Sequence, residues 1–274
     1  MALADRASLC GLKVTPGLFS TQGTLPWTPF SDSVGPLAKS SEDISDMLSV
    51  WHGSKDYSQF LISTWLPLRV GFLHPGYLEQ VIAEIEVAIG RISQYGGVVK
   101  KWVNLRRFGA DGDDSSLQKV GWHDYAAGFR EFISHNFNDS SIQTLKDLVD
   151  FNNQHANRVL TPSCPKQDKL ISAIEHQDKV WKNLRQTNRD AVEATMRENG
   201  IDLIIGAPTG RFPTIAAAAG CPSVTLPLGY SKQNERPLGL MALAQPNRGG
   251  FTGERRERLG SHIRIAQTTS ALRR

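Results

Sequence analysis

The clearest pattern of hydrophobic and polar positions lies in the second quarter of the chain. Leu66–Leu73 is a mostly apolar run, interrupted by Arg69, that predicts a buried strand. In Tyr77–Tyr95 apolar residues recur every three or four positions, which predicts an amphipathic helix that stops at Gly96 and Gly97. Val98–Leu105 predicts a second strand. A strand, a helix and a strand in this order predict a parallel pair joined by a crossover helix.

Further apolar runs near the end of the chain predict more strands. Ile201–Ile205 and Ser223–Pro227 are short and apolar, and Leu238–Ala244 is expected to pair nearby. A turn over Gly206–Gly210 and a short alanine-rich helix over Thr214–Ala219 separate the first two. We therefore expect an α/β fold with a mixed, largely parallel sheet flanked by helices on both faces. One sheet should contain Leu66–Leu73, Val98–Leu105, Ile201–Ile205 and Ser223–Pro227.

The rest of the chain alternates between turn-rich and helical segments. Residues 1–36 are rich in Gly, Pro, Ser and Thr, which predicts tight turns joining short strands, and residues 108–116 read as a polar loop. A serine cap at Ser40 or Ser41 introduces a helix that reaches Trp51. Three more helices are expected over Gly121–Phe137, Ile142–Gln154 and Gln167–Asn199, the last one long and closed by Gly200.

Composition and charge fit a folded protein with little affinity for nucleic acid. Of the 274 residues, 40% are hydrophobic and 21% are charged. The net charge of +4 comes from the end of the chain, where Phe251–Arg274 holds six arginines and two glutamates. A neutral body argues against binding nucleic acid, and a short basic tail is more often solvated than bound to an acidic surface. We expect one partial domain over residues 1–250 and a divergent basic tail over 251–274.

Nothing in the sequence indicates secretion, a membrane span, a metal site or a cofactor. Asp5 and Arg6 stand where a signal peptide needs an apolar run. Cys10, Cys164 and Cys221 are widely spaced, without a Cys-x-x-Cys pair or a Cys/His cluster, so we expect three buried thiols in a reducing compartment, the cytoplasm. We expect no metal, no cofactor and no contact with a membrane.

Two groups of short motifs resemble the amidase signature family. The first group is Cys10-Gly-Leu-Lys-Val-Thr-Pro-Gly17, Thr21-Gln-Gly-Thr-Leu-Pro26 and Phe30-Ser-Asp-Ser-Val-Gly-Pro-Leu-Ala-Lys39. The second group is Ile201-Asp-Leu-Ile-Ile-Gly-Ala-Pro208, the strand and turn over Ile215–Gly229, and Pro237-Leu-Gly-Leu240. The motifs occur in the family's order over residues 3–244, and Ala4–Leu9 is most similar to the fungal branch.

The resemblance implies hydrolysis of a small-molecule amide by a Ser-Ser-Lys triad. In that mechanism a serine attacks the carbonyl, and a neutral lysine accepts its proton through a second serine. The family carries all three residues upstream of its Gly-Leu-Lys turn, so the resemblance implies that none of them is in this chain. We therefore expect no catalytic residue here and no activity from the chain alone.

Several residues imitate catalytic groups but have simpler interpretations. Ser8 and Lys13 look like a Ser-Lys pair, but no Gly-rich oxyanion loop precedes Ser8, and Lys13 is expected to hold backbone carbonyls. Asp32 reads as a turn residue that binds its own backbone rather than as a general acid. Gly206–Gly210 lacks the Lys-Ser/Thr ending and the spacing of a phosphate loop.

The histidines and aromatic residues are also better explained by structure than by chemistry. Trp27, Phe30 and Trp122 either line a pocket or pack in the core, the latter being favoured, and Trp181 lies on a helix stripe. Surface or helix-capping roles are expected for the scattered histidines, which are His52, His74, His123, His135, His155, His176 and His262.

Three interpretations of the whole chain remain open. The favoured one is a shortened amidase-signature hydrolase that is inactive alone. The second is a complete enzyme whose catalytic residues were lost in gene prediction. The third is a non-enzymatic remnant that docks on a partner, as a homo- or hetero-oligomer, through an exposed sheet edge.

Overall fold

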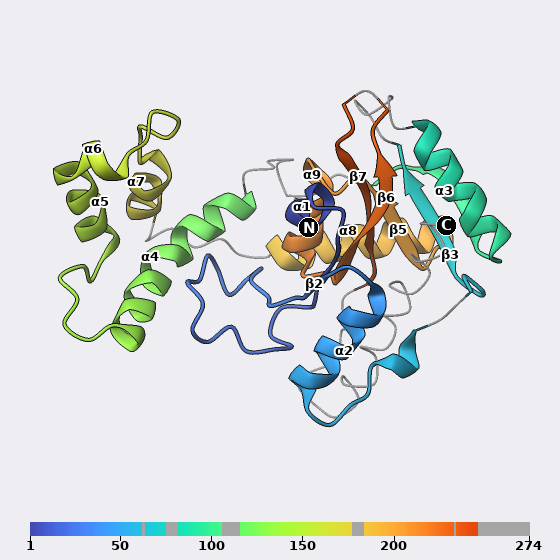
Figure 1. Ribbon diagram of the computed structural model, residues 1–274, viewed down its shortest axis with the longest axis horizontal. Coiled ribbons are helices and arrows are strands. Elements are labelled where there is room, and N and C mark those ends of the chain that lie inside the picture. Colours follow the sequence, from blue (N-terminus) through green and yellow to red (C-terminus); the bar gives the residue numbers. More distant parts are fainter. Residues whose placement is uncertain (62–63, 75–81, 106–115, 177–183, 233, 246–274) are drawn as a thin grey trace. The chain divides into compact units, whose positions relative to one another are not determined.

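The computed structural model describes residues 1–61, 64–74, 82–105, 116–176, 184–232 and 234–245 (Figure 1). These residues form two compact units. Unit 1 takes the described parts of Met1–Thr15, Val34–Gly112 and Arg185–Arg274, and unit 2 those of Pro16–Ser33 and Asp113–Leu184. The expected basic tail, the loop over 108–115 and the residues around Trp181 lie outside the described residues. The single domain over 1–250 stays a prediction.

Unit 1 is built on one sheet, whose described strands follow the order β2-β1-β6-β7-β5-β3-β4. The expected strands share this sheet, so that prediction is confirmed. The strands are β1 (Cys10–Lys13), β2 (Leu37–Ala38), β3 (Arg69–Leu73), β4 (Val98–Val103), β5 (Leu203–Gly206), β6 (Ser223–Tyr230) and β7 (Pro237–Leu243).

The strand directions confirm a mixed sheet and qualify the expectation that it is largely parallel. Among the described strands only β1 and β7 run against the other five, yet β3 with β4 and β3 with β5 are the parallel pairs and the remaining four pairings are antiparallel. The causes are β1, which lies between β2 and β6, and β7, which follows β6 after a short connection, pairs with it as a hairpin and lies between β6 and β5.

The β3–α3–β4 unit is confirmed as a parallel pair joined by a helix. Helix α3 (Ile82–Gln94) buries Ile85, Ala88, Ile89 and Ile92, which are the face that the periodicity predicts. It ends at Gln94, and Gly96 follows in the turn with a φ of 90°, which favours glycine. The first residues of the expected helix, 77–81, lie outside the described residues.

Both faces of the sheet are covered, as expected. Ile204 packs in a buried cluster with Met196 of α8 (Leu184–Asn199) and Ala216 of α9 (Arg211–Ala219). Successive residues of a strand point to opposite faces, so Leu203 and Ile205 point away from this cluster, and both are also buried. The continuous apolar run of β5 therefore reflects a strand enclosed on its two sides.

Helix α2 (Ser41–His52) confirms the serine cap. The side chain of Ser40 accepts a hydrogen bond from the backbone N–H of Asp43, 3.1 Å away. Residues 1–36 differ from the expected series of short strands: they hold a short helix, α1 (Ala2–Arg6), then β1, and then turns. A single-turn 3-10 helix, η1 (Ser58–Phe60), lies between α2 and β3.

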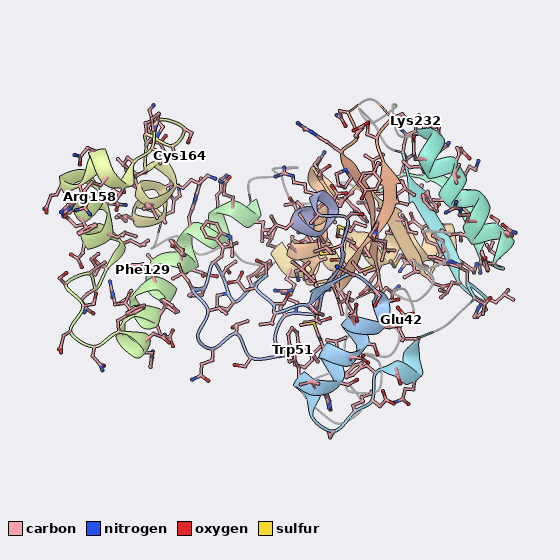
Figure 2. The ribbon with its side chains drawn as sticks, viewed as in Figure 1. Glu42, Trp51, Phe129, Arg158, Cys164 and Lys232 are labelled. Atoms are coloured by element: carbon pink, nitrogen blue, oxygen red, sulfur yellow. The ribbon has the colours of Figure 1, made fainter. Side chains whose placement is uncertain are left out.

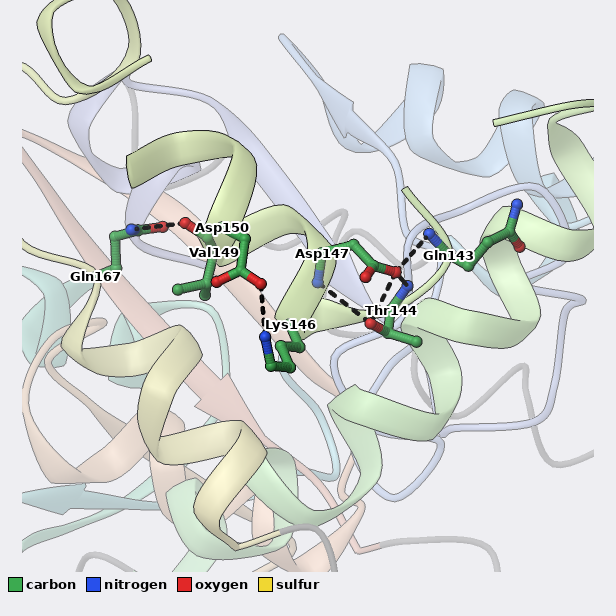
Figure 3. A network of polar contacts seen from close by, with 7 residues as sticks. All are labelled: Gln143, Thr144, Lys146, Asp147, Val149, Asp150 and Gln167. Atoms are coloured by element: carbon green, nitrogen blue, oxygen red, sulfur yellow. Dashed lines mark hydrogen bonds and ion pairs between the residues drawn. The ribbon is translucent and has the colours of Figure 1, made fainter. Parts of the chain in front are cut away.

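Unit 2 is helical, with a small apolar core. Its helices are α4 (Ser116–Asn136), α5 (Leu145–Gln154), α6 (Ala156–Val159) and α7 (Asp168–Glu175). Phe129 and Ala126 of α4 pack with Leu145 of α5 and Ala173 of α7. Figure 3 shows the capping box of α5, in which Thr144 accepts from the N–H of Asp147 while the Asp147 carboxylate accepts from the N–H of Thr144.

The single long helix expected over Gln167–Asn199 is wrong. Helix α7 ends at His176, whose backbone is not helical, and α8 starts at Leu184. The two helices serve different cores: Ala173 packs with α4 and α5 in unit 2, whereas Met196 packs against the sheet of unit 1. The sequence does not reveal this division, because both helices are mostly polar and their apolar residues recur at a similar helical spacing.

Candidate functional site

The structure brings the two groups of motifs into adjacent strands. β1, from the first group, pairs with β6, from the second, through Gly11 opposite Thr225 and Lys13 opposite Ser223. β6 in turn pairs with β7 along its whole length. Segments more than 200 residues apart in the sequence thus form one surface of unit 1, and α1 packs on both β6 and β7.

Three glycines of the motifs are required by close approaches at this place. A Cβ on Gly35 would lie 1.8 Å from the carbonyl oxygen of Leu12, and one on Gly11 would lie 2.7 Å from the Cβ of Ala4. A Cβ on Gly239 would lie 2.6 Å from Oδ1 of Asp5. The glycines of these motifs therefore let α1, β1 and β7 approach one another closely.

Asp5 fixes α1 to β7, and the sequence analysis did not predict this role. Its carboxylate accepts a hydrogen bond from the backbone N–H of Gly239. Burial raises the pKa of Asp5, although this hydrogen bond and the nearby Arg6 oppose the rise. The only sequence signal was an acidic residue six positions before the Gly-Leu-Lys turn, which fits many surface positions.

Three basic side chains approach Cys221 at the end of α9. Lys13, Arg185 and Arg189 each favour its thiolate, but burial dominates and raises the pKa of Cys221 to about 12. The group is therefore a neutral thiol near pH 7 and a poor nucleophile. Arg189 donates from Nε to the carbonyl oxygen of Ala219 at 2.9 Å, which satisfies the C-terminus of α9.

Burial and the nearby Arg189 also lower the pKa of Arg185, to about 10. Arg185 therefore remains a cation at neutral pH. Its guanidinium lies directly against the backbone of Gly220, where a Cβ would meet Nη1 at 1.8 Å. Gly220 is thus needed both for this contact and for its left-handed φ of 66°.

The structure agrees with the simple interpretation of Lys13 and Asp32. Lys13 Nζ donates to the carbonyl oxygen of Val14 at 3.5 Å, a backbone contact of the expected kind. Asp32 Oδ2 accepts from the backbone N–H groups of Trp27 at 2.7 Å and Thr28 at 2.9 Å. Ser8 follows α1 with a φ of 52°, and the absence of a catalytic role for it stays a prediction.

A polar cluster in unit 2 was not predicted. The buried hydroxyl of Thr28 donates to Oδ2 of Asp124, and His123 Nδ1 lies 2.7 Å from Oδ1 of the same carboxylate. Thr28 also accepts from the N–H of Phe30 at 3.1 Å. The cluster ties the loop before Ser33 to α4, and its members are too far apart in the sequence for local pattern to reveal it.

The described histidines mostly end helices, as expected. His135, His155 and His176 each place Nδ1 within 2.9 Å of the carbonyl oxygen four residues earlier. His52 contacts Ser54, and the ring of His74 lies against Trp102. His262 lies outside the described residues. Among the described residues no three His, Cys, Asp or Glu side chains gather as a metal site would require.

The tryptophans favour core packing over a pocket. Trp27 covers Gly121, where a Cβ would meet its ring at 2.1 Å, and contacts Tyr125 at a centroid distance of 5.4 Å. Trp122 packs against the core of unit 2. Cys10 and Cys221 are buried as expected, whereas Cys164 is exposed, because it lies in the turn after α6 where no element covers it. In the described part of the chain, no helix has the length and apolarity to cross a membrane.

The fold matches solved amidases. A native peptide amidase from Stenotrophomonas maltophilia superposes with a TM-score of 0.78 at 21% identity, over 99% of this chain and 59% of that one. No protein-family model matches the chain.

Two curated relatives are amidases by name. A candidate amidase of Schizosaccharomyces pombe is 24% identical over 86% of this chain and 50% of its own length. Another, from Arthroderma benhamiae, is 23% identical over 82% of this chain and 43% of its own length. The fold and the motif surface define a mixed α/β sheet unit of the kind found in solved amidases. The motifs and these relatives support the amidase signature family for this chain, which spans about half the length of the curated relatives that it matches.

Proposed function

We propose that this chain forms the structural half of an amide-hydrolysing enzyme. The observation that carries the proposal is the convergence of β1, β6 and β7 on α1, with glycine wherever a side chain would block the approach. Such a surface holds α1 in one position against the sheet, and nucleophilic catalysis depends on that kind of fixed geometry. The substrate class is a small-molecule amide.

We propose further that the chain alone does not hydrolyse amides. The resemblance assigns the nucleophile, the bridging serine and the lysine to residues before the Gly-Leu-Lys turn. Ser8 and Lys13 are the residues of this chain that most resemble a catalytic serine and lysine. The Nζ of Lys13 donates a hydrogen bond to the backbone carbonyl of Val14. The neutral thiol of Cys221 offers no replacement nucleophile.

Sequencing the transcript through both ends of this reading frame tests whether the catalytic residues are encoded upstream of this chain. An in-frame upstream exon that encodes a Gly-Ser-rich loop, a lysine and a serine would support an active longer protein. Both this chain and the extended one should then be assayed for ammonia release from primary amides and for labelling by a fluorophosphonate. We expect turnover and an upstream labelled serine only in the extended protein.

A matched variant makes the assay decisive for this chain. Ser8→Ala should change neither labelling nor turnover of the 274-residue chain. Turnover by the chain alone, or labelling that maps to Ser8 and disappears in Ser8→Ala, would overturn the proposal of inactivity. An extended protein that folds, carries all three residues and still hydrolyses no amide would overturn the proposed enzyme.

The second candidate function is a non-enzymatic remnant that binds a partner through a sheet edge. The two edges of the described sheet are β2 and β4, and Leu37 and Val98 on them are 48% and 61% exposed. Lys100 and Lys101 are exposed on β4, and edge lysines discourage pairing, so β2 is the better edge for a partner. Light scattering on the purified chain separates a defined complex from a monomer. We also infer a cytoplasmic location, which the buried Cys10 and Cys221 support because neither is part of a disulfide.

A further inference from the structure

The segment Pro16–Ser33 belongs to unit 2, although its neighbours on both sides in the sequence belong to unit 1. It leaves unit 1 after Thr15, shortly beyond the end of β1, and returns at Val34, shortly before β2 begins. We call this segment the strap; it is drawn in blue beside α4 in Figure 1. The strap therefore connects two paired strands of unit 1 by way of the helical unit.

The strap residues Pro26–Thr28 lie along one face of α4. The indole of this segment covers Gly121, where an added Cβ would lie 2.1 Å from the ring, and its proline covers Gly128, where an added Cβ would lie 2.7 Å from Cγ. Its threonine hydroxyl donates a hydrogen bond to Asp124. Positions 121, 124 and 128 recur every three or four residues, so they share one side of the helix. The absence of a side chain at two of these positions lets the strap approach the helix closely.

Two further features make the strap part of a single rigid body with the helices. Its own turn is fixed by Asp32, whose carboxylate accepts hydrogen bonds from the backbone N–H groups of Trp27 at 2.7 Å and Thr28 at 2.9 Å. On another face of α4, Phe129 packs in the core that α4 forms with α5 and α7 (Figure 2). Helix α4 thus contacts the strap on one side and the other helices on another, so we expect these elements to move together.

Both ends of the strap carry a buried hydroxyl without a hydrogen bond. No group in the described part of the chain bonds to Oγ1 of Thr15 or to Oγ of Ser33. The two residues flank the points where the chain passes between the units, and Gly17, beside the first point, has a left-handed φ of 83°. Buried hydroxyls are rarely left in this state, because each has given up its hydrogen bonds to water. A different arrangement of the two ends, in which these hydroxyls find partners, would therefore compete with this one.

We propose that the strap and the helices of unit 2 move as one body relative to unit 1, with hinges at Thr15–Pro16 and Ser33–Val34. Compact units of one chain are generally able to move relative to each other, and a hinge is a few loop residues that absorb the change in backbone angles. The strap follows directly on β1, so it carries such a movement to the strand against which α1 packs. The inference does not rest on amide hydrolysis.

Double electron–electron resonance on the whole 274-residue chain tests the proposal through distances between pairs of spin labels. The background is Cys164→Ser, because Cys164 is exposed, whereas Cys10 and Cys221 are buried and should stay unlabelled. The labels are placed at exposed positions of the strap, of α4 and of α2 in unit 1, which are Gln22→Cys, Glu131→Cys and Val50→Cys.

The strap–α4 pair of labels should give one narrow distribution of distances. The strap–α2 and α4–α2 pairs should both give distributions that are roughly twofold wider, because the strap moves with α4 and not with unit 1. A wide strap–α4 distribution, or narrow distributions for all three pairs, would overturn the proposal.

Substitutions within the strap test its attachment to α4. Trp27→Ala combined with Thr28→Val removes the indole and the hydroxyl that contact the helix, and should widen the strap–α4 distribution roughly twofold. Thr24→Val is the control, because the hydroxyl of Thr24 donates to the carbonyl oxygen of Thr21 within the strap. It should leave the strap–α4 distribution unchanged. Equal widths in the double variant and the control would contradict the attachment.

Substitutions at the two ends of the strap test the hinges. Thr15→Val combined with Ser33→Ala removes both buried hydroxyls that lack a partner, so the arrangement described here should gain population and the strap–α2 distribution should narrow. Ser20→Ala is the control, because the hydroxyl of Ser20 is exposed and accepts from the backbone N–H of Gln22. It should leave the width unchanged. A strap–α2 distribution that is equally wide in the double variant and the unmodified strap would contradict the hinge positions.

Discussion

Unit 1 and helix α5 of unit 2 are stabilised over different distances along the sequence. In unit 1, β1 pairs with β6, and Gly239 contacts Asp5, so the important contacts join the two ends of the described chain. In unit 2, α5 is fixed by groups a few residues apart, namely the Thr144–Asp147 capping box and the Lys146–Asp150 ion pair at 2.6 Å (Figure 3). The fold of unit 1 therefore depends on long-range approach, and α5 depends on local hydrogen bonds.

This difference explains where the family resemblance lies. Most of the motif residues are glycines and short strand sequences of unit 1, where only a missing side chain permits the approach of Gly35 to Leu12, although Thr21–Pro26 belongs to unit 2. Helices held by local caps tolerate many sequences with equal helix propensity. The substitutions below sharpen or break this comparison, and they run from the largest expected effect to the smallest.

Gly35→Ala should be the most damaging change. The new methyl group would lie 1.8 Å from the carbonyl oxygen of Leu12, and backbone atoms cannot give way cheaply. We expect a loss of about 4 kcal/mol or more in the free energy of unfolding, measured by urea denaturation. The matched control is Gly90→Ala on α3, where no atom lies within 4 Å of the added Cβ, and which should stabilise by about 0.5–1 kcal/mol. Similar values for both variants would break the comparison.

Phe129→Ala should remove about 3 kcal/mol from the stability of unit 2. Phe129 is 5% exposed and packs with Leu145 and Ala173 in the core of the helices. Hydrogen exchange should accelerate in α4, α5 and α7 while the strands of unit 1 keep their protection. Phe137→Ala is the control, because Phe137 is 52% exposed and its loss should cost less than about 0.5 kcal/mol. Equal acceleration in β5 and β6 would show that the two units unfold together.

Thr144→Ala should cost about 1 kcal/mol, because it removes the side-chain half of the capping box. Thr144→Ser keeps the hydroxyl and should be nearly neutral. Ser40→Ala removes the equivalent cap of α2 in unit 1 and should cost about the same amount. Exchange rates in the first turn of each helix report the loss. A much larger cost for Ser40→Ala would mean that caps in unit 1 also serve long-range packing.

The smallest effects concern pH, and their signs should be opposite in the two units. Burial raises the pKa of Asp5 above its ordinary 3.8, so its ionised form is disfavoured in the folded state. Stability from Asp5 is then present below pH 3.8 and declines as the pH rises through the folded pKa. Relative to Asp5→Asn, the unmodified chain should lose stability over that rise.

Asp147 behaves in the other direction. Hydrogen bonds from the Thr144 side chain and from the backbone of Gln143 and Thr144 lower the pKa of Asp147 below 3.8. Its contribution is present above pH 3.8 and declines as the pH falls through the folded pKa. Urea titrations of Asp147→Asn and the unmodified chain from pH 2.5 to 6 should converge at the acid end. Divergence there would contradict the assigned cause.

The local secondary structure of this protein can be predicted from its sequence. The apolar spacing of 85–92 predicted the buried face of α3, Ser40 predicted the start of α2, and the run at 201–205 predicted a strand enclosed on both sides. Each of these signals acts within one or two helical turns or along one strand, where periodicity and capping are read directly from neighbouring residues. The motif order also indicated the family.

Only the tertiary structure decided how these elements combine. The insertion of β7 between β6 and β5, the division of Gln167–Asn199 into α7 and α8, and the docking of Asp5 on Gly239 all depend on distant partners. The hydrogen bond from Thr28 to Asp124 likewise joins residues 96 positions apart. Periodicity shows which face of an element is apolar, but it carries no information about which distant segment covers that face.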